Sequence, residues 1–296
     1  MGEDHQPLLK IGLPKGSLET PTIDLFDRAG YNIDVRSRSY TPEIDDPQMS
    51  CVMFRAQEMA RYVEDGVIDI GITGHDWVVE NNADVHEVCE LAYSRATGRP
   101  VRWVLAVPEE GGIDDPRQLE GKIISTELLN TTQRYFQEQG INVRKVEFSW
   151  GATEVKPPVL ADAIVDVTET GSSLRANQLR VIDLVQESTP RLIAHHASWA
   201  DPWKRGKLER LRMLLLGAIA AATRVGLSMN VPKERLDAVL ALLPDAGRPT
   251  ISPLANPAWV DVFVIVEESF VRDLLPPLHE AGARGIVESP VLKIID

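Results

Sequence analysis

Short apolar runs alternate with amphipathic stretches of helix length along most of this chain, and no other feature constrains the fold as strongly. Residues 8–13 form an apolar run broken by Lys10, residues 14–17 form a loop with Pro and Gly, and residues 22–28 have helical spacing. Further strand-like runs lie at 67–73, 101–107, 122–125 and 163–168, and further helical stretches at 53–64, 130–139 and 173–179. This alternation predicts an α/β fold with largely parallel strands.

A six-residue pattern occurs twice, each time at the end of a predicted strand. Asp69–Gly74 and Asp166–Gly171 both read Asp-x-x-x-Thr-Gly, and each precedes a predicted helix start. The repeat predicts two similar α/β lobes with the ligand between them, and chance similarity is the alternative explanation. We expect the first lobe to comprise residues 1–104, completed by 190–222, and the second to comprise residues 105–189.

The remaining segment, residues 223–296, has a different order of elements. Strand-like segments lie at 225–231, 250–252, 259–266 and 285–291, and helical segments at 233–243 and 267–281. This β-α-β-β-α-β order predicts a separate ferredoxin-like domain. The segment contains no clustered carboxylates, no metal-ligand set and no nucleophile, so its simplest interpretation is an oligomerisation domain.

Charge and composition limit the partners of the chain. Its 44 acidic and 31 basic residues give a formal net charge of −13, which opposes a general attraction to nucleic acid or to an anionic membrane. The longest apolar run, 213–222, is shorter than the roughly 20 residues that cross a bilayer, and the first residues resemble no export signal. With only two isolated cysteines, the chain is expected to be cytoplasmic and to bind neither nucleic acid nor membrane.

The strongest local signal lies where the predicted strand 163–168 leads into a hydroxyl-rich turn and a helix start. The candidate residues of this segment are Asp166, Glu169, Thr170, Gly171, Ser172 and Ser173. Helix starts present NH groups without partners, and glycine lets the backbone approach a ligand, so a phosphate group fits here. The carboxylates can accept hydrogen bonds from sugar hydroxyls or approach a hydrated Mg²⁺. An ordinary serine N-cap is the alternative.

A second candidate site is the loop Gly12–Leu18, in which Lys15 can neutralise a polyphosphate. The loop lacks the spacing of a P-loop, and a solvated lysine is the alternative. A third candidate region is locally basic in this acidic chain and contains Arg36, Arg38 and Arg55. The alternative to a functional role is a surface strand with solvated side chains. No GxGxxG sequence is present, which disfavours a dinucleotide dehydrogenase.

Motifs for metal or nucleophilic catalysis are missing from the sequence. His195 and His196 are adjacent, so their side chains point apart, and no further His or Cys lies at ligand spacing. Cys51 and Cys89 are expected to pack as apolar residues. No GxSxG nucleophile elbow occurs.

Taken together, these motifs resemble one family, the long form of ATP phosphoribosyltransferase, which catalyses the first step of histidine biosynthesis. The resemblance extends from Leu9 to Ile295, and it implies two lobes like those of a two-lobed binding protein plus a C-terminal ACT-like domain. Its most specific segments are Leu13–Leu18, Arg55–Glu58, Tyr62–Gly66, Gly71–Gly74, Ala161–Asn177 and Gly282–Glu288.

The resemblance implies that N1 of the adenine of ATP attacks C1′ of phosphoribosyl pyrophosphate (PRPP) and expels pyrophosphate. N1 carries its own lone pair, so no Ser, Cys or His nucleophile is needed, and catalysis depends on positioning and on charge stabilisation by Mg²⁺ and basic groups. Lys15, Asp166 and Glu169 are the implied catalytic residues, and the Mg²⁺ ligands stay unassigned. The residues implied to bind PRPP are Asp166, Glu169, Thr170, Gly171, Ser172 and Ser173. Those implied to bind ATP are Lys15, Gly16, Ser17, Arg55 and Gly74.

Two departures from the family pattern affect the ATP contacts. Many members carry Arg where this chain has Ser17, so we expect Arg36 or Arg38 to supply the missing positive charge. The segment Ser125–Thr131 also differs from the usual family sequence.

The resemblance further implies inhibition by L-histidine, bound between C-terminal domains near Thr250 and Ala283, and a homo-hexamer. We expect 259–266 and 285–291 to be edge strands available for pairing. Two alternatives remain, a non-catalytic two-lobed solute-binding protein and a regulatory paralogue that has lost its activity. The missing export signal and the C-terminal domain argue against the first, and the intact phosphate loop argues against the second.

Overall fold

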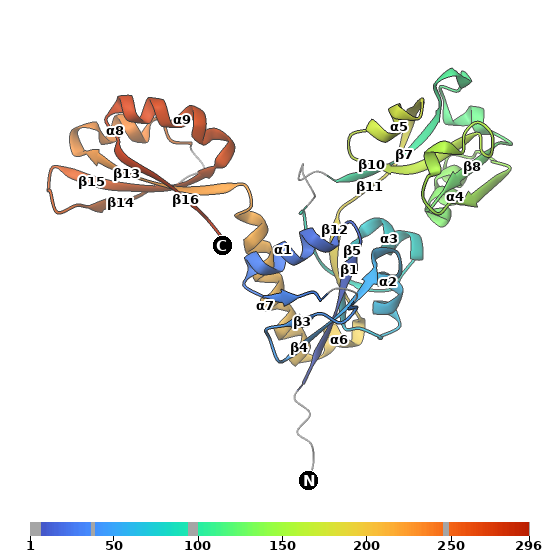
Figure 1. Ribbon diagram of the computed structural model, residues 1–296, viewed down its shortest axis with the longest axis horizontal. Coiled ribbons are helices and arrows are strands. Elements are labelled where there is room, and N and C mark those ends of the chain that lie inside the picture. Colours follow the sequence, from blue (N-terminus) through green and yellow to red (C-terminus); the bar gives the residue numbers. More distant parts are fainter. Residues whose placement is uncertain (1–6, 37–38, 94–99, 245–248, 296) are drawn as a thin grey trace, which may run out of the picture. The chain divides into compact units, whose positions relative to one another are not determined.

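The protein divides into two compact units, of which the larger contains two five-stranded sheets and the smaller one four-stranded sheet (Figure 1). The computed structural model describes residues 7–36, 39–93, 100–244 and 249–295. The larger unit consists of Met1–Asp27 and Tyr31–Arg212, and the smaller of Arg28–Gly30 and Met213–Asp296. Within the described residues, no helix is both long enough and apolar enough to cross a membrane.

The first five-stranded sheet and its helices form what we call the first lobe. Its strand order is β4 (Met49–Arg55), β1 (Leu9–Lys15), β5 (Ile70–Gly74), β12 (Pro190–Ala194) and β6 (His86–Glu90). The helices of this lobe are α1 (Glu19–Ala29), α2 (Ala56–Glu64), α3 (His75–Asn81), α6 (His196–Ala200) and the first part of α7 (Pro202–Ala220). A small hairpin, β2 (Ile33–Asp34) with β3 (Glu43–Ile44), precedes β4.

The second sheet repeats this arrangement, and with its helices it forms the second lobe. Its strand order is β9 (Lys145–Phe148), β8 (Ile123–Thr126), β10 (Ala163–Thr168), β7 (Val101–Pro108) and β11 (Leu179–Ser188). The helical elements are η1 (Glu109–Gly111), η2 (Pro116–Leu119), α4 (Leu129–Glu138), η3 (Thr153–Val155) and α5 (Ser172–Ala176). Tyr135 and Phe136 of α4 pack on the apolar face of β7, β8 and β10.

The two sheets explain the repeated sequence pattern. In each, three strands run parallel and the third of them, β5 or β10, pairs with one antiparallel strand, β12 or β7. The Asp-x-x-x-Thr-Gly pattern therefore marks the same strand in both lobes. The prediction of two similar α/β lobes is confirmed.

The chain passes between the lobes twice, and the first strand after each passage is the antiparallel one. Strand β7 begins at Val101 and pairs only within the second sheet, so the second lobe begins before residue 104, where we had ended the first. The sequence also predicted a helix over 53–64, whereas residues 49–55 form the edge strand β4. Each five-stranded sheet contains both parallel and antiparallel strand pairs, so the pairing is less uniformly parallel than predicted.

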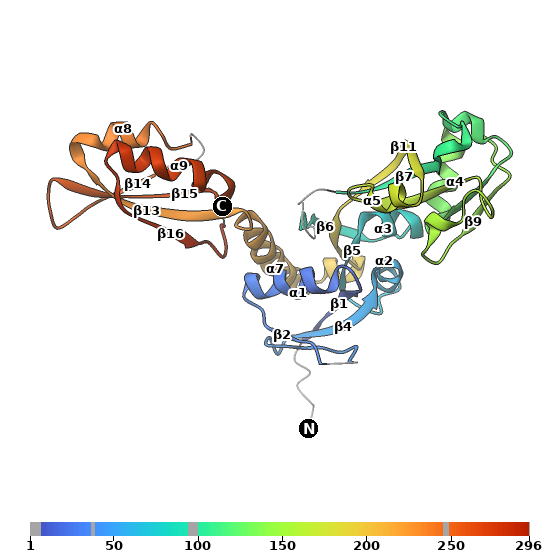
Figure 2. The ribbon, with the colours of Figure 1, turned by 45° about the horizontal axis from the view of Figure 1, so that its top comes forward.

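The smaller unit has the predicted β-α-β-β-α-β order, with its helices on one side of the sheet (Figure 2). The strand order is β14 (Thr250–Pro253), β15 (Trp259–Glu267), β13 (Arg224–Pro232) and β16 (Arg284–Pro290). The helices are η4 (Lys233–Arg235), α8 (Leu236–Leu240) and α9 (Glu268–Ala281). Alternate residues of β13 and β15 face the helices and form the core. Because β15 lies inside the sheet, the prediction that 259–266 is an edge strand is wrong, and the edges are β14 and β16.

Candidate active site

A cleft of about 1140 Å³ lies in the larger unit and is lined by residues of both lobes. Lys15 ends β1, Arg55 ends β4 and Gly74 ends β5. From the second lobe, Thr168 ends β10 and Glu127 follows β8. The carboxyl ends of parallel strands in an α/β sheet are the usual place for ligands, because the loops there are free of sheet hydrogen bonds. Here two sheets direct these ends into one cleft.

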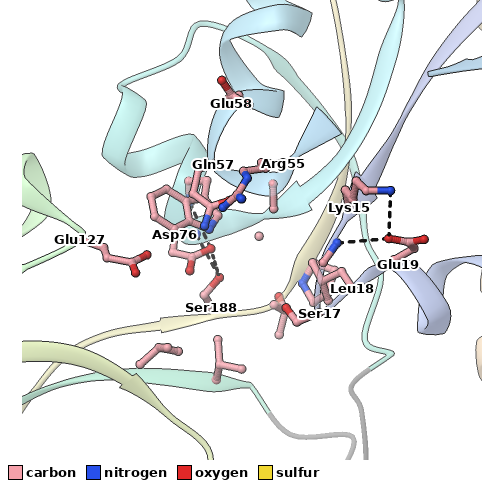
Figure 3. Close-up of a pocket in the computed structure, with 18 of the residues that line it drawn as sticks. Lys15, Ser17, Leu18, Glu19, Arg55, Gln57, Glu58, Asp76, Glu127 and Ser188 are labelled. Atoms are coloured by element: carbon pink, nitrogen blue, oxygen red, sulfur yellow. Dashed lines mark hydrogen bonds and ion pairs between the residues drawn. The ribbon is translucent and has the colours of Figure 1, made fainter. Parts of the chain in front are cut away.

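The first lobe contributes every residue that the resemblance assigned to ATP. Lys15, Gly16, Ser17, Arg55 and Gly74 all line the cleft. Figure 3 shows Lys15 beside Glu19, with their charged atoms 3.9 Å apart. The Lys15 ammonium also lies 4.9 Å from the centre of the Tyr40 ring. Glu19 was not identified from the sequence, because Lys15 ends a strand and Glu19 begins the next helix, so no helical spacing links the two residues.

Gly74 is required by the close approach of a carboxylate. A Cβ atom at this position would lie 2.0 Å from Oδ1 of Asp76, so any other residue would displace that side chain. Asp76 is buried, accepts a hydrogen bond from the Trp103 indole at 2.7 Å and one from the Ser188 hydroxyl at 2.8 Å. Burial raises the pKa of Asp76. Sequence reasoning missed this residue, because its partners lie in the second lobe.

The second lobe contributes the hydroxyl-rich turn. Four residues of this turn line the cleft: Glu169, Thr170, Ser172 and Ser173. The three with hydroxyl groups are exposed to solvent. The Thr170 hydroxyl donates to Ser172 at 3.0 Å, and Ser173 donates to the carboxylate of Glu154. These hydroxyl groups are therefore accessible from the cleft, as a phosphate ligand would require.

Gly171 is needed for its backbone conformation and not for contact with the cleft. Its φ is +71°, and its NH donates to Thr168 Oγ1 at 2.7 Å. Gly171 is buried and does not line the cleft. The structure therefore does not show the predicted close approach of its backbone to a phosphate. The positive φ reverses the chain between β10 and α5 and thereby presents the flanking hydroxyls.

Asp166 lies beside the cleft and does not line it. Burial raises the pKa of its carboxyl to about 7, with Glu154 and Glu127 adding to the increase and the Val167 NH opposing it. Of these neighbours, Glu127 itself lines the cleft. Glu154 also accepts a hydrogen bond from Ser173, so acidic side chains lie next to the hydroxyl-rich turn.

Of the two residues expected to replace the charge missing at Ser17, Arg36 does not reach the cleft. Arg36 pairs with Glu43 at 2.9 Å and with Asp34 at 3.4 Å, and it does not line the cleft. Arg38 lies outside the described residues. With Ser at position 17, the cationic side chains that line the cleft among the described residues are Lys15 and Arg55.

The described residues do not form a metal site made of protein ligands alone. In the described part of the chain, no group of three or more His, Cys, Asp or Glu side chains is arranged to hold a metal ion. A protein cage for Mg²⁺ is therefore not formed there. The carboxylates near the turn instead fit a Mg²⁺ held mainly by substrate phosphates and water, which is the usual way this ion is bound.

The two residues predicted to bind histidine lie far apart in the small sheet. Thr250 starts the edge strand β14, whereas Ala283 precedes β16 at the opposite edge. Ala283 is fully buried in the core, and its NH donates to Leu278 O at 3.0 Å. The space expected beside its small side chain is therefore filled by core residues of the same chain, and a contact of Ala283 with histidine stays a prediction. A site using both edges requires two chains.

Fold and site together define a two-lobed α/β protein with a ligand cleft that is cationic on one side and hydroxyl-rich on the other, followed by a ferredoxin-like domain. Residues 55–217 match the family described as ATP phosphoribosyltransferase, and residues 221–293 match the HisG C-terminal domain. The chain belongs to the ATP phosphoribosyltransferase family.

Curated relatives and one solved structure agree with this assignment. The ATP phosphoribosyltransferase of Solibacter usitatus is 60% identical over 97% of this chain and 99% of its own. That of Pelodictyon phaeoclathratiforme is 57% identical over 98% of each chain. A chain of the ATP phosphoribosyl transferase (HisG:HisZ) complex from Thermotoga maritima is 28% identical, with a TM-score of 0.61 over 71% of this chain and 99% of that chain. None of these relatives favours the solute-binding alternative.

Proposed function

We propose that this protein transfers the 5-phosphoribosyl group of PRPP to N1 of the adenine of ATP, with release of pyrophosphate, in the first step of L-histidine biosynthesis. The single observation that carries the proposal is the composition of the cleft. Cationic groups of the first lobe and the hydroxyl-rich turn of the second face the same space, and both implied substrates are polyanions. The names of the relatives supply the identity of those substrates.

The reaction needs geometry more than proton transfer. The N1 lone pair forms the new bond to C1′, the bond from C1′ to the pyrophosphate oxygen breaks, and its electron pair leaves with pyrophosphate. Attack from the face opposite the leaving group inverts the anomeric carbon. Because N1 is already unprotonated, the cleft has to hold the two reacting atoms in line and stabilise the charge on pyrophosphate.

The two lobes take different substrates in this proposal. The turn around Ser172 and Ser173 holds the 5-phosphate of PRPP, and Glu169, which lines the cleft, accepts from the ribose hydroxyls. Asp166 does not line the cleft, and we assign it electrostatic support of this site. Lys15 and Arg55 hold phosphate groups across the cleft. Since Lys15 lies beside Glu19, a phosphate must compete with that carboxylate for the ammonium group.

Mg²⁺ completes the proposal as a charge-neutralising ion. When bound, it withdraws negative charge from the pyrophosphate leaving group. We assign its water ligands to Glu127 and Glu169, which line the cleft. Asp166, with its raised pKa, gains negative charge more readily when a cation is near.

Regulation and assembly are further parts of the proposal. We assign inhibition by L-histidine to the C-terminal domain, with Thr250 at an exposed strand edge as a contact residue, and homo-hexamer formation to the edges β14 and β16. Thr250 and β14 are exposed at the edge of the sheet, and exposed edges are usually covered in assemblies. A cytoplasmic location suits substrates of this kind.

Pyrophosphate release is the test. Purified full-length protein with ATP, PRPP and MgCl₂ should release pyrophosphate in proportion to the ATP consumed. GTP in place of ATP is the matched control, because N1 of guanine carries a proton and has no free lone pair. Equal release with GTP, or no release with ATP, would refute the proposed reaction. Unchanged rates in excess EDTA would refute the role of Mg²⁺, and unchanged rates in millimolar L-histidine would refute the regulation.

A further inference from the structure

Helix α3 extends from the cleft to the second lobe. It begins directly after Gly74, and its first turn contains Asp76 and Trp77, which line the cleft. Asp76 bonds to Trp103 and Ser188 of the second sheet, and the Trp77 ring packs edge-on against Trp103 with centres 6.1 Å apart. The start of α3 thus contacts both lobes at the cleft itself.

The other end of α3 holds the second lobe through Glu80. This side chain is 8% exposed, and its two carboxylate oxygens accept hydrogen bonds from the backbone NH groups of Asn130 and Thr131, each at 2.9 Å. The Asn130 side chain donates back to the Glu80 carbonyl at 2.9 Å, and Arg134 donates to the Val79 carbonyl at 2.9 Å. Four hydrogen bonds therefore join the end of α3 to the start of α4.

Glu80 replaces a cap that α4 lacks in its own sequence. The N-cap residue of α4 is Leu128, which makes no side-chain cap, and the first turn of α4 contains no acidic residue. An N-cap side chain normally accepts from the second and third helical NH groups, which here belong to Asn130 and Thr131. The carboxylate also interacts favourably with the positive end of the helix dipole. The stability of α4 therefore depends on a residue of the first lobe.

We propose that Glu80 is a positioning residue for the transfer reaction, which fixes the second lobe against the first so that the two substrates meet in line across the cleft. The inference rests on the proposed function, in which ATP binds the first lobe and the PRPP loop belongs to the second. Glu80 does not line the cleft, so its contribution is the relative placement of the lobes. A misplacement of about 1 Å between reacting groups lowers a rate by roughly a hundredfold.

The central experiment compares Glu80→Ala with Glu138→Ala, a control glutamate that is exposed near the other end of α4. Glu80→Ala should lower kcat roughly ten- to a hundredfold, whereas the dissociation constants for ATP and PRPP measured separately by calorimetry should change less than about twofold, because each substrate uses mainly one lobe. Glu138→Ala should leave all three quantities unchanged. An unchanged kcat in Glu80→Ala would overturn the proposal.

A second variant separates positioning from simple helix capping. Asn130→Asp in the Glu80→Ala background returns an acidic side chain to the first turn of α4 without a link to the first lobe. Because this change also removes the donation of the Asn130 amide to the Glu80 carbonyl, Asn130→Asp alone is its control and should leave kcat within about threefold of the wild type. We expect this double variant to recover melting temperature but not kcat. Recovery of both would reduce Glu80 to a cap and refute the proposal. If Glu80→Ala does not fold, Glu80→Gln, which keeps one acceptor oxygen, should show a smaller loss of kcat with the same unchanged dissociation constants.

A distance measurement tests the inference without activity. Spin labels at Arg61→Cys on α2 and Gln133→Cys on α4, both exposed positions, in a chain with Cys51 and Cys89 replaced by Ala, report the spacing of the lobes. The distribution should be narrow with Glu80 and broader with Glu80→Ala, and an identical distribution would refute the positioning role. If the parent protein releases no pyrophosphate, the proposed function fails while this measurement still decides whether Glu80 fixes the lobes.

Discussion

Replacing Asp166 by Asn should stabilise the protein at high pH and not at low pH. The side chain lies on β10, where burial and the neighbouring carboxylates of Glu154 and Glu127 raise its pKa from 3.8 to about 7. Asn has nearly the same shape and carries no charge at any pH. The difference between the two proteins therefore isolates the free energy of ionising this carboxyl in the folded state.

The sign and size follow from linkage. Between pH 4 and pH 7 the folded state keeps the proton on Asp166 whereas the unfolded state has lost it, so the wild-type protein loses stability as pH rises through this interval. A shift of about 3 units corresponds to about 4 kcal/mol at 1.36 kcal/mol per unit. Because the carboxyl is partly exposed, solvent screening reduces this value, and we expect about 1–3 kcal/mol.

Urea unfolding of the ligand-free proteins from pH 4.5 to pH 8.5 measures the effect. The variant should be nearly as stable as the wild type at pH 4.5 and progressively more stable above it, up to a constant difference above pH 8. Glu154→Gln removes one of the neighbouring charges and should shrink the pH dependence. Turnover of Asp166→Asn should fall, since a carboxylate near ribose has been lost. A stability difference that is constant with pH would refute the reasoning.

Substitutions at two further positions test the backbone of the turn and the core of the C-terminal domain. Gly171→Ala should lower the free energy of unfolding by about 1 kcal/mol and Gly171→Val by more, because φ at this position is +71°. Both variants should also weaken PRPP binding, measured by titration, because they displace the flanking hydroxyl groups. Unchanged PRPP affinity in Gly171→Val would place the phosphate elsewhere. Ala283→Phe should destabilise the C-terminal domain by about 1–3 kcal/mol through overpacking, measured by urea unfolding, and an unchanged midpoint would show that the core around Ala283 has free space.

The sequence was most informative where a local pattern determines a local structure. Strand and helix positions around β1, β10 and α9 follow from apolar periodicity, and the hydroxyl-rich turn was recognised because helix starts have a characteristic residue order. The repeated Asp-x-x-x-Thr-Gly pattern correctly indicated two related lobes, because it marks the corresponding strand in both sheets. The turns that follow differ, since Gly74 is extended with φ of −69° and Gly171 has φ of +71°.

Features that depend on distant contacts could not be predicted in this way. The edge strand β4 was mistaken for part of a helix, because its apolar residues continue directly into the amphipathic α2. The site was incomplete without Glu19, Asp76 and Glu80, whose roles arise from neighbours that only the folded chain provides. The space beside Ala283 was misjudged for a related reason: a small residue in sequence can be either an opening for a ligand or a tightly packed core position.

The double passage of the chain between the lobes affects the order in which the protein can be made. The second sheet is built from β7 to β11 without interruption, so all its strands have been synthesised by Ser188. The first sheet must wait for β12, which ends at Ala194 and fills the position between β5 and β6. During translation, the buried strand β5 therefore has an unpaired edge until the whole second lobe has emerged, and an open edge of this kind pairs readily with other chains. Rapid folding of the second lobe brings the two ends of that segment together and shortens the time for which the first lobe stays incomplete.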